Sequence, residues 1–65
     1  MNKNEIKNRI YQGSLVNISK EDYLNGSREI LQDIAGEFID AQDGVRAQIA
    51  LAEVKRLDKT HNFVL

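Results

Sequence analysis

Few side chains in this sequence have both the type and the spacing needed for catalysis or metal binding. The single histidine, His61, lies near the end of the chain, and cysteine is absent. A catalytic triad needs a nucleophile, a base and an orienting group together, and a structural zinc site needs several nitrogen or sulfur ligands. His61 cannot assemble either site within one chain. We therefore expect it to be a solvated histidine in a polar tail.

Carboxylates are the second group with possible chemistry. Four of them recur every three or four residues in the middle of the chain: Glu29, Asp33, Glu37 and Asp40. On a helix this spacing brings pairs together, and such pairs could hold a divalent cation. A solvated, acidic helix face is the simpler interpretation, and it is the one we adopt.

The remaining motifs also fail to indicate a site. Asp43-Gly44 is the residue pair found in the middle of a calcium loop, but a loop with Gly44 at its sixth position would start at Ile39, which has no ligand oxygen in its side chain. The four glycines form no phosphate-binding motif. A chain this short also seldom provides an enzyme's pocket. We predict no enzyme, no catalytic residue, no metal site and no cofactor.

Length and composition favour a small domain that associates with a copy of itself. The 65 residues suffice for one domain, residues 1–65, and such a chain buries only about 60% of the surface that its unfolded form exposes. With neither cysteine nor proline, disulfides and thiolate metal sites cannot supplement the core. Oligomerisation is the remaining means of stabilisation. We therefore expect a homo-oligomer, most simply a homodimer.

The apolar residues are too scattered for a membrane span. The longest apolar run covers four residues, 49–52, whereas a spanning helix needs about 20. No charged-then-apolar segment precedes a small-residue cleavage site, so we expect a cytoplasmic protein that has no membrane partner. Its short length and its Asn-, Lys- and Ile-rich beginning are typical of bacterial or bacteriophage accessory proteins.

The elements that must position these side chains are helices. One apolar stripe follows the helical repeat and consists of Ile30, Leu31, Ile34, Phe38, Ala41 and Val45. The acidic residues occupy the opposite side. This pattern predicts a helix over residues 27–42, with Ser27 as its N-cap and Glu29 in its first turn. Phe38 should be the most buried aromatic residue.

Beyond Gly44 the apolar stripe changes phase. Ala47, Ala50, Leu51, Val54 and Leu57 form a new face that, on one straight helix, would point almost opposite to the first. Asp43-Gly44 favours a turn, because glycine tolerates positive φ and aspartate can cap the next helix. We favour a hairpin of two helices, 27–42 and 45–58. One kinked long helix stays open, because two residues are a tight connection.

The first 26 residues predict short helical or irregular elements. Ile6 and Ile10 favour a short helix that ends at Gly13, although two short strands around Gln12-Gly13 are an alternative. The segment Ser19-Lys20-Glu21-Asp22 fits a capping box, so a short helix should start at Ser19, direct Tyr23 and Leu24 inward and end at Gly26. Residues 59–65 should form a flexible tail. The fold class is therefore all-α.

These patterns indicate a small helical protein-protein interaction or regulatory accessory protein that acts through apolar helix faces. Its expected interface residues are Ile30, Leu31, Ile34, Phe38, Val45, Leu51, Val54 and Leu57. The expected partners are a second copy and another protein. Charge is segregated along the chain: residues 1–20 carry four basic side chains against one acidic, and residues 21–43 carry seven acidic against one basic. Basic and acidic segments should therefore lie side by side in a bundle.

Two other functions remain as alternatives. The basic residues Lys3, Lys7 and Arg9 at one end and Lys55, Arg56 and Lys59 at the other could bind nucleic acid if they converge. The acidic ridge, which we define as Glu29, Asp33, Glu37, Asp40 and Asp43, argues against this because it would repel phosphate. The same ridge could instead imitate a DNA backbone and capture a DNA-binding protein.

Overall fold

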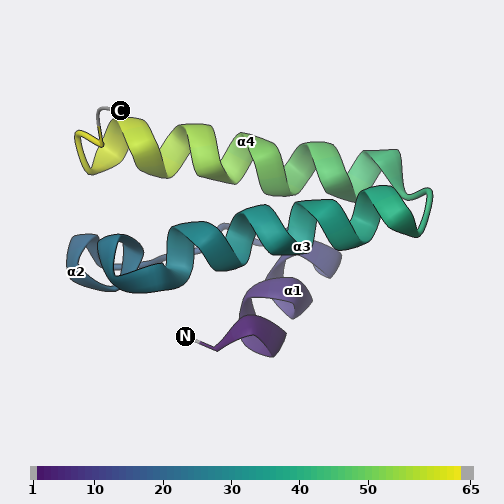
Figure 1. Ribbon diagram of the computed structural model, residues 1–65, viewed down its shortest axis with the longest axis horizontal. Coiled ribbons are helices and arrows are strands. Elements are labelled where there is room, and N and C mark those ends of the chain that lie inside the picture. The colour runs from purple at the N-terminus through teal and green to yellow at the C-terminus, as the bar shows by residue number, and fades with distance from the viewer. Residues whose placement is uncertain (1, 64–65) are drawn as a thin grey trace.

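The protein is all-α, as its sequence predicts, and its two longest helices form an antiparallel hairpin. The computed structural model describes residues 2–63, and this part of the chain contains no strand. Its elements are α1 (Lys3–Tyr11), α2 (Lys20–Asp22), the wide turn η1 (Tyr23–Ser27), α3 (Arg28–Asp40) and α4 (Gly44–Thr60). Figure 1 shows α3 and α4 side by side, with α1 packed at an angle against them.

The connection between α3 and α4 is short because Asp43 takes part both in the C-terminal turn of α3 and in the N-cap of α4. The amide of Gln42 donates to the Ile39 carbonyl at 2.9 Å and that of Asp43 donates to the Phe38 carbonyl at 2.8 Å, with Gln42 in the left-handed region at φ 59°. This is a Schellman motif, which satisfies the last carbonyls of α3. Asp43 then caps α4 by accepting from the Arg46 amide at 3.1 Å. The predicted hairpin is thus confirmed over the kinked helix.

Two other helices end in the same way. After α1, Gly13 has φ 69° and the Ser14 amide donates to the Arg9 carbonyl at 2.9 Å. After α4, Asn62 has φ 54° and the Phe63 amide donates to the Asp58 carbonyl at 2.8 Å. The predicted end of the first helix at Gly13 is therefore confirmed, and the strand alternative is wrong.

The segment from α2 to α3 fulfils the sequence predictions only in part. The Ser19 hydroxyl accepts from the Asp22 amide at 3.2 Å, as the capping pattern predicts, and Gly26 interrupts the helix with φ 133°. Ser27, however, is no N-cap: its backbone is already helical, and its side chain makes no capping bond. Leu24 is exposed rather than buried, because the neighbouring Tyr23 takes the inward position and successive helical side chains diverge by about 100°.

One continuous core lies between the hairpin and the N-terminal part of the chain. Its members are Ile6, Ile10, Val16, Ile18, Tyr23, Leu31, Ile34, Ala35, Phe38, Ala47, Ala50, Val54 and Leu57. The N-terminal part of the chain covers the apolar side that the hairpin leaves open, by means of α1 and of residues 14–19, which belong to no helix and which we call the extended segment. Tyr23 is at least as buried as Phe38, so the expectation that Phe38 is the most buried aromatic residue is wrong.

The structure places the eight expected interface residues in three environments. Leu31, Ile34, Phe38, Val54 and Leu57 are buried within the core of a single chain. Ile30 packs partly buried against that core, whereas Val45 and Leu51 are exposed. Both apolar stripes are therefore largely covered without a second chain.

The sequence predicts a flexible tail over residues 59–65, and the structure gives helix and packing contacts to part of this segment. Helix α4 continues to Thr60, and the Schellman motif after it turns Phe63 back onto the core. Residues 64 and 65 lie outside the described residues. Residues 58–62 are mostly polar, and for that reason the sequence did not indicate that the helix continues. A helix end can be polar throughout when its last carbonyls are paired.

Candidate functional site: a pocket between η1, α3 and Phe63

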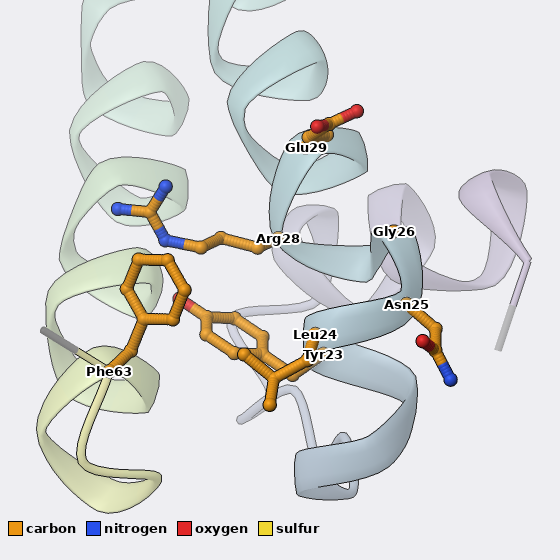
Figure 2. Close-up of a pocket in the computed structure, with 7 residues that line it drawn as sticks. All are labelled: Tyr23, Leu24, Asn25, Gly26, Arg28, Glu29 and Phe63. Atoms are coloured by element: carbon orange, nitrogen blue, oxygen red, sulfur yellow. The ribbon is translucent and has the colours of Figure 1, made fainter. Parts of the chain in front are cut away.

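A surface pocket of about 380 Å³ lies where η1 meets α3, beside the chain that returns after α4. We call it the η1–α3 pocket, and Figure 2 shows the residues that line it: Tyr23, Leu24, Asn25, Gly26, Arg28, Glu29 and Phe63. Its volume falls within the range of about 300–1,000 Å³ that is usual for binding sites of small groups. Six of these residues come from one continuous segment, whereas Phe63 comes from the opposite end of the chain.

Phe63 forms one wall because of the backbone that precedes it. The left-handed turn at Asn62 reverses the chain, and the Phe63 ring then lies edge-on to Tyr23 with ring centroids 6.3 Å apart. The guanidinium of Arg28 lies 4.3 Å from the centroid of the Phe63 ring. This cation–π contact fixes the two side chains against each other.

A partly buried polar network supports the inner wall. Arg28 donates from Nε and Nη2 to the two carboxylate oxygens of Asp58, at 2.9 and 3.1 Å. The Tyr23 hydroxyl donates to the same carboxylate and lies 3.1 Å from the Val54 carbonyl oxygen. Because a bidentate arginine–carboxylate pair fixes both orientation and distance, α3, η1 and α4 are held together at this point.

The electrostatics of this network fix the charge states of Asp58 and Tyr23. The hydrogen bonds from Arg28, aided by that from Tyr23, outweigh desolvation and hold the pKa of Asp58 below its usual value. Burial, together with the hydrogen bond to Asp58, raises the pKa of Tyr23 to about 12. The phenol therefore stays protonated at neutral pH, so it is neither a base nor an activated nucleophile.

His61 is not the solvated tail residue that its position in the sequence suggests. Its Nε2 lies 2.8 Å from the Ile18 carbonyl oxygen, and its ring centroid lies 5.4 Å from that of Tyr23. Helix α4 extends beyond residue 58 and therefore brings His61 alongside the extended segment. His61 therefore links the two ends of the chain.

A second ion pair, formed by Glu53 and Arg56 and partly buried, attaches the extended segment to α4. Glu53 accepts from the Val16 amide at 2.9 Å, and Arg56 donates to the Val16 carbonyl at 2.6 Å and to both Glu53 oxygens. Burial favours a higher pKa for Glu53, but the hydrogen bonds from Arg56 and Val16 outweigh it and leave the pKa below its usual value. Both polar groups of the Val16 backbone are thus paired by side chains of α4.

The acidic ridge is partly neutralised within the chain. Glu37 pairs with Lys3 at 2.7 Å and with Lys7 at 3.5 Å, and Asp43 pairs with Arg46 at 2.9 Å. The predicted contact between the basic beginning and the acidic middle therefore exists. The other ridge members, Glu29, Asp33 and Asp40, are exposed and make no ion pair within residues 2–63. Over the same residues, no group of three or more His, Asp or Glu side chains has the arrangement of a metal site.

Sequence reasoning missed this pocket, since none of the eight expected interface residues lines it. One local signal was present: asparagine followed by an aromatic residue, directly after a helix, is typical of a Schellman motif with its accompanying apolar contact.

No helix in the described part of the chain has both the length and the apolar character to cross a membrane. Comparisons with known proteins found no matching family model, no similar curated protein and no similar solved structure.

Proposed function

We propose that the chain is a small cytoplasmic accessory protein that binds another protein through the η1–α3 pocket. The observation that supports this proposal is the combination of an exposed apolar rim with a fixed wall. Leu24 is 51% exposed at the pocket, and Phe63 is only partly buried. Arg28 is already held by Asp58 and by the Phe63 ring. A partner would therefore lose little free energy in ordering the surface that it meets.

The lining residues suggest what the partner presents. An apolar side chain would contact Leu24 and Phe63, while Glu29 at the rim would accept hydrogen bonds from the partner's backbone. An apolar anchor within a polar rim is the usual arrangement of a protein-protein contact. The proposed ligand is therefore a protein segment with one exposed aliphatic or aromatic side chain.

We also propose that the chain associates with a second copy, through apolar side chains that the hairpin leaves exposed. The need to cover two apolar stripes no longer supports it, since one chain buries most of both. Support now comes from Ile39, Val45 and Leu51, which the hairpin leaves exposed. Sedimentation equilibrium of the wild type and of a Val45→Asp variant would test it. A monomer at all concentrations would exclude the homodimer.

The alternative functions have less support. Lys3, Lys7 and Arg56, three of the six basic residues considered for nucleic-acid binding, already pair with carboxylates of the same chain. Counterion release on phosphate binding would require breaking those pairs. The DNA-mimic hypothesis is weakened in the same way, because Glu37 and Asp43 of the acidic ridge already pair with basic side chains of the chain itself.

A peptide-display selection tests the principal proposal. A random peptide library is panned on the wild-type chain, and the enriched peptides are measured against two variants, Leu24→Asp and Leu15→Asp. The two leucines form a matched pair, because Leu15 is 60% exposed but does not line the pocket. We expect peptides with an apolar anchor to lose affinity by about tenfold or more for Leu24→Asp only.

Two outcomes would contradict the proposal. One is a selection that enriches no peptide with an apolar anchor. The other is a set of peptides that bind Leu24→Asp as tightly as they bind Leu15→Asp. Circular dichroism of both variants controls for folding, since each substitution lies at an exposed position.

A further inference from the structure

Asn25 lies in an exposed break of the helical segment and is followed by glycine. Its backbone, with φ −90° and ψ 15°, and that of Gly26, with φ 133°, leave the helical region within η1, shortly before α3 begins. The Asn25 side chain is exposed and makes no hydrogen bond with any described residue. Figure 2 shows its amide directed away from Arg28 and Phe63. Apart from Gly26 itself, its chain neighbours and the adjoining helix backbone, no atom lies within 4 Å of the place where a Cβ at Gly26 would stand.

A second asparagine or aspartate followed by glycine occurs in the chain, and the structure protects it. Asp43 precedes Gly44, but its Oδ1 accepts from the Arg46 amide at 3.1 Å and its Oδ2 accepts from the Arg46 side chain at 2.9 Å. Gly44 is also the first residue of α4. Moving the Asp43 carboxyl group toward the following amide would therefore break a helix cap, which typically contributes about 1 kcal/mol to stability.

We propose that Asn25 is a site of spontaneous covalent modification through a succinimide. The backbone nitrogen of Gly26 attacks Cγ of Asn25, a nitrogen–carbon bond forms, and the side-chain amide leaves as ammonia with the proton from that nitrogen. Solvent water then adds to one of the two ring carbonyls and opens the ring to aspartate or to isoaspartate. Glycine favours the step because it has no side chain to hinder the attack and permits the required backbone rotation.

The modification changes the candidate site. Both products place a carboxylate on a rim that already carries Glu29, so a partner meets a more negative surface. Isoaspartate also adds a methylene to the main chain between Tyr23 and Arg28, which the Asp58 network holds in place. The chemistry at Asn25 does not depend on the proposed protein-binding function.

Peptide mapping by mass spectrometry tests the assignment on the full chain. The folded protein and a urea-unfolded sample are incubated in mildly alkaline buffer made with isotopically labelled water, and each asparagine is followed over time. Asn17 is the internal reference, because it is exposed but is followed by the β-branched Ile18. Asn25→Gln is the matched variant, because the longer side chain closes its ring far more slowly.

We expect Asn25 to gain labelled oxygen in the folded protein at a rate within a few-fold of the unfolded rate. Asn17 and the Asn25→Gln position should stay unmodified over the same period. Asp43 should take up label about fivefold more slowly in the folded protein than in urea, because a helix cap of about 1 kcal/mol must break. The proposal is overturned if Asn25 stays intact in the folded protein while it converts in urea, or if it converts in neither sample.

Discussion

The partly buried ion pair of Glu53 and Arg56 on α4 provides the sharpest test of the described fold. Glu53→Gln keeps the size of the side chain and one oxygen that can accept from the Val16 amide, but it removes the negative charge. Arg56 then loses its two charge-assisted bonds, at 2.9 and 2.8 Å, while it still faces the Val16 carbonyl. The variant therefore isolates the charge from the packing.

The expected loss of stability can be estimated from these contacts. Hydrogen bonds to charged groups contribute about 1.5–3 kcal/mol each, against about 0.5–1.5 kcal/mol for neutral ones. The Arg56 side chain is 35% exposed, so solvent screening reduces this difference. We expect Glu53→Gln to cost about 1–2 kcal/mol at neutral pH, a large share of the roughly 3–10 kcal/mol available to a chain of this length.

The pH dependence has a definite sign. Because the pKa of folded Glu53 lies below its usual value, its stabilisation is complete above the unfolded pKa of about 4.3 and disappears as pH falls through the folded pKa. The difference between wild type and Glu53→Gln should therefore be constant near neutral pH and should shrink in acid. Urea denaturation at several pH values measures it.

Amide hydrogen exchange gives a local readout. The Val16 amide belongs to no helix, and its acceptor in the structure is Glu53, so Glu53→Gln should accelerate its exchange. Glu29→Gln is the control, because this exposed carboxylate makes no ion pair among the described residues and should change stability by about 0.5 kcal/mol or less. Unchanged stability at neutral pH, together with unchanged Val16 exchange, would refute the assigned contact.

Three further predictions concern packing, the turn and charge. Phe38→Ala should cost about 3–5 kcal/mol and unfold much of the protein, whereas Val45→Ala, at a 73% exposed position, should leave the melting temperature almost unchanged; calorimetry compares them. Gln42→Gly should stabilise the hairpin by about 0.5–1 kcal/mol in urea denaturation, because glycine removes the strain of a φ of 59°; a destabilised variant would contradict the turn. The double variant Asp33→Lys and Asp40→Lys should leave peptide binding at the pocket unchanged, whereas gel retardation of DNA by the wild type at physiological salt would favour the nucleic-acid alternative.

Much of the secondary structure could be predicted because its signals are local. The apolar repeat around Ile34 and Phe38 is contained within a few helical turns, and it gave α3 to within two residues at each end. Ser19 and Asp43 could be assigned as caps because each bonds an amide three residues onward. Ser27 failed because the backbone leaves the helical region at Asn25 and Gly26, before Ser27, which is itself already helical.

The candidate site could not be predicted, because its contacts join residues far apart in sequence. Arg28 and Asp58 are 30 residues apart, and Tyr23 and Asp58 are 35 apart. Nothing in the local sequence distinguishes these side chains from other charged and aromatic residues. Only packing of α4 along η1 and α3 brings them together, and Phe63 joins them because of the turn after α4.

The sequence by itself determined that this chain forms amphipathic helices and a turn at Asp43, because periodicity and capping act within about four residues. Tertiary structure alone decided what covers the apolar faces. A stripe containing Leu31 and Val54 must be buried, yet its sequence is the same whether a second chain or the chain's own N-terminal segment covers it. The choice depends on whether α1 and the extended segment can reach the hairpin. Val16 is held there by Glu53, a contact across 37 residues.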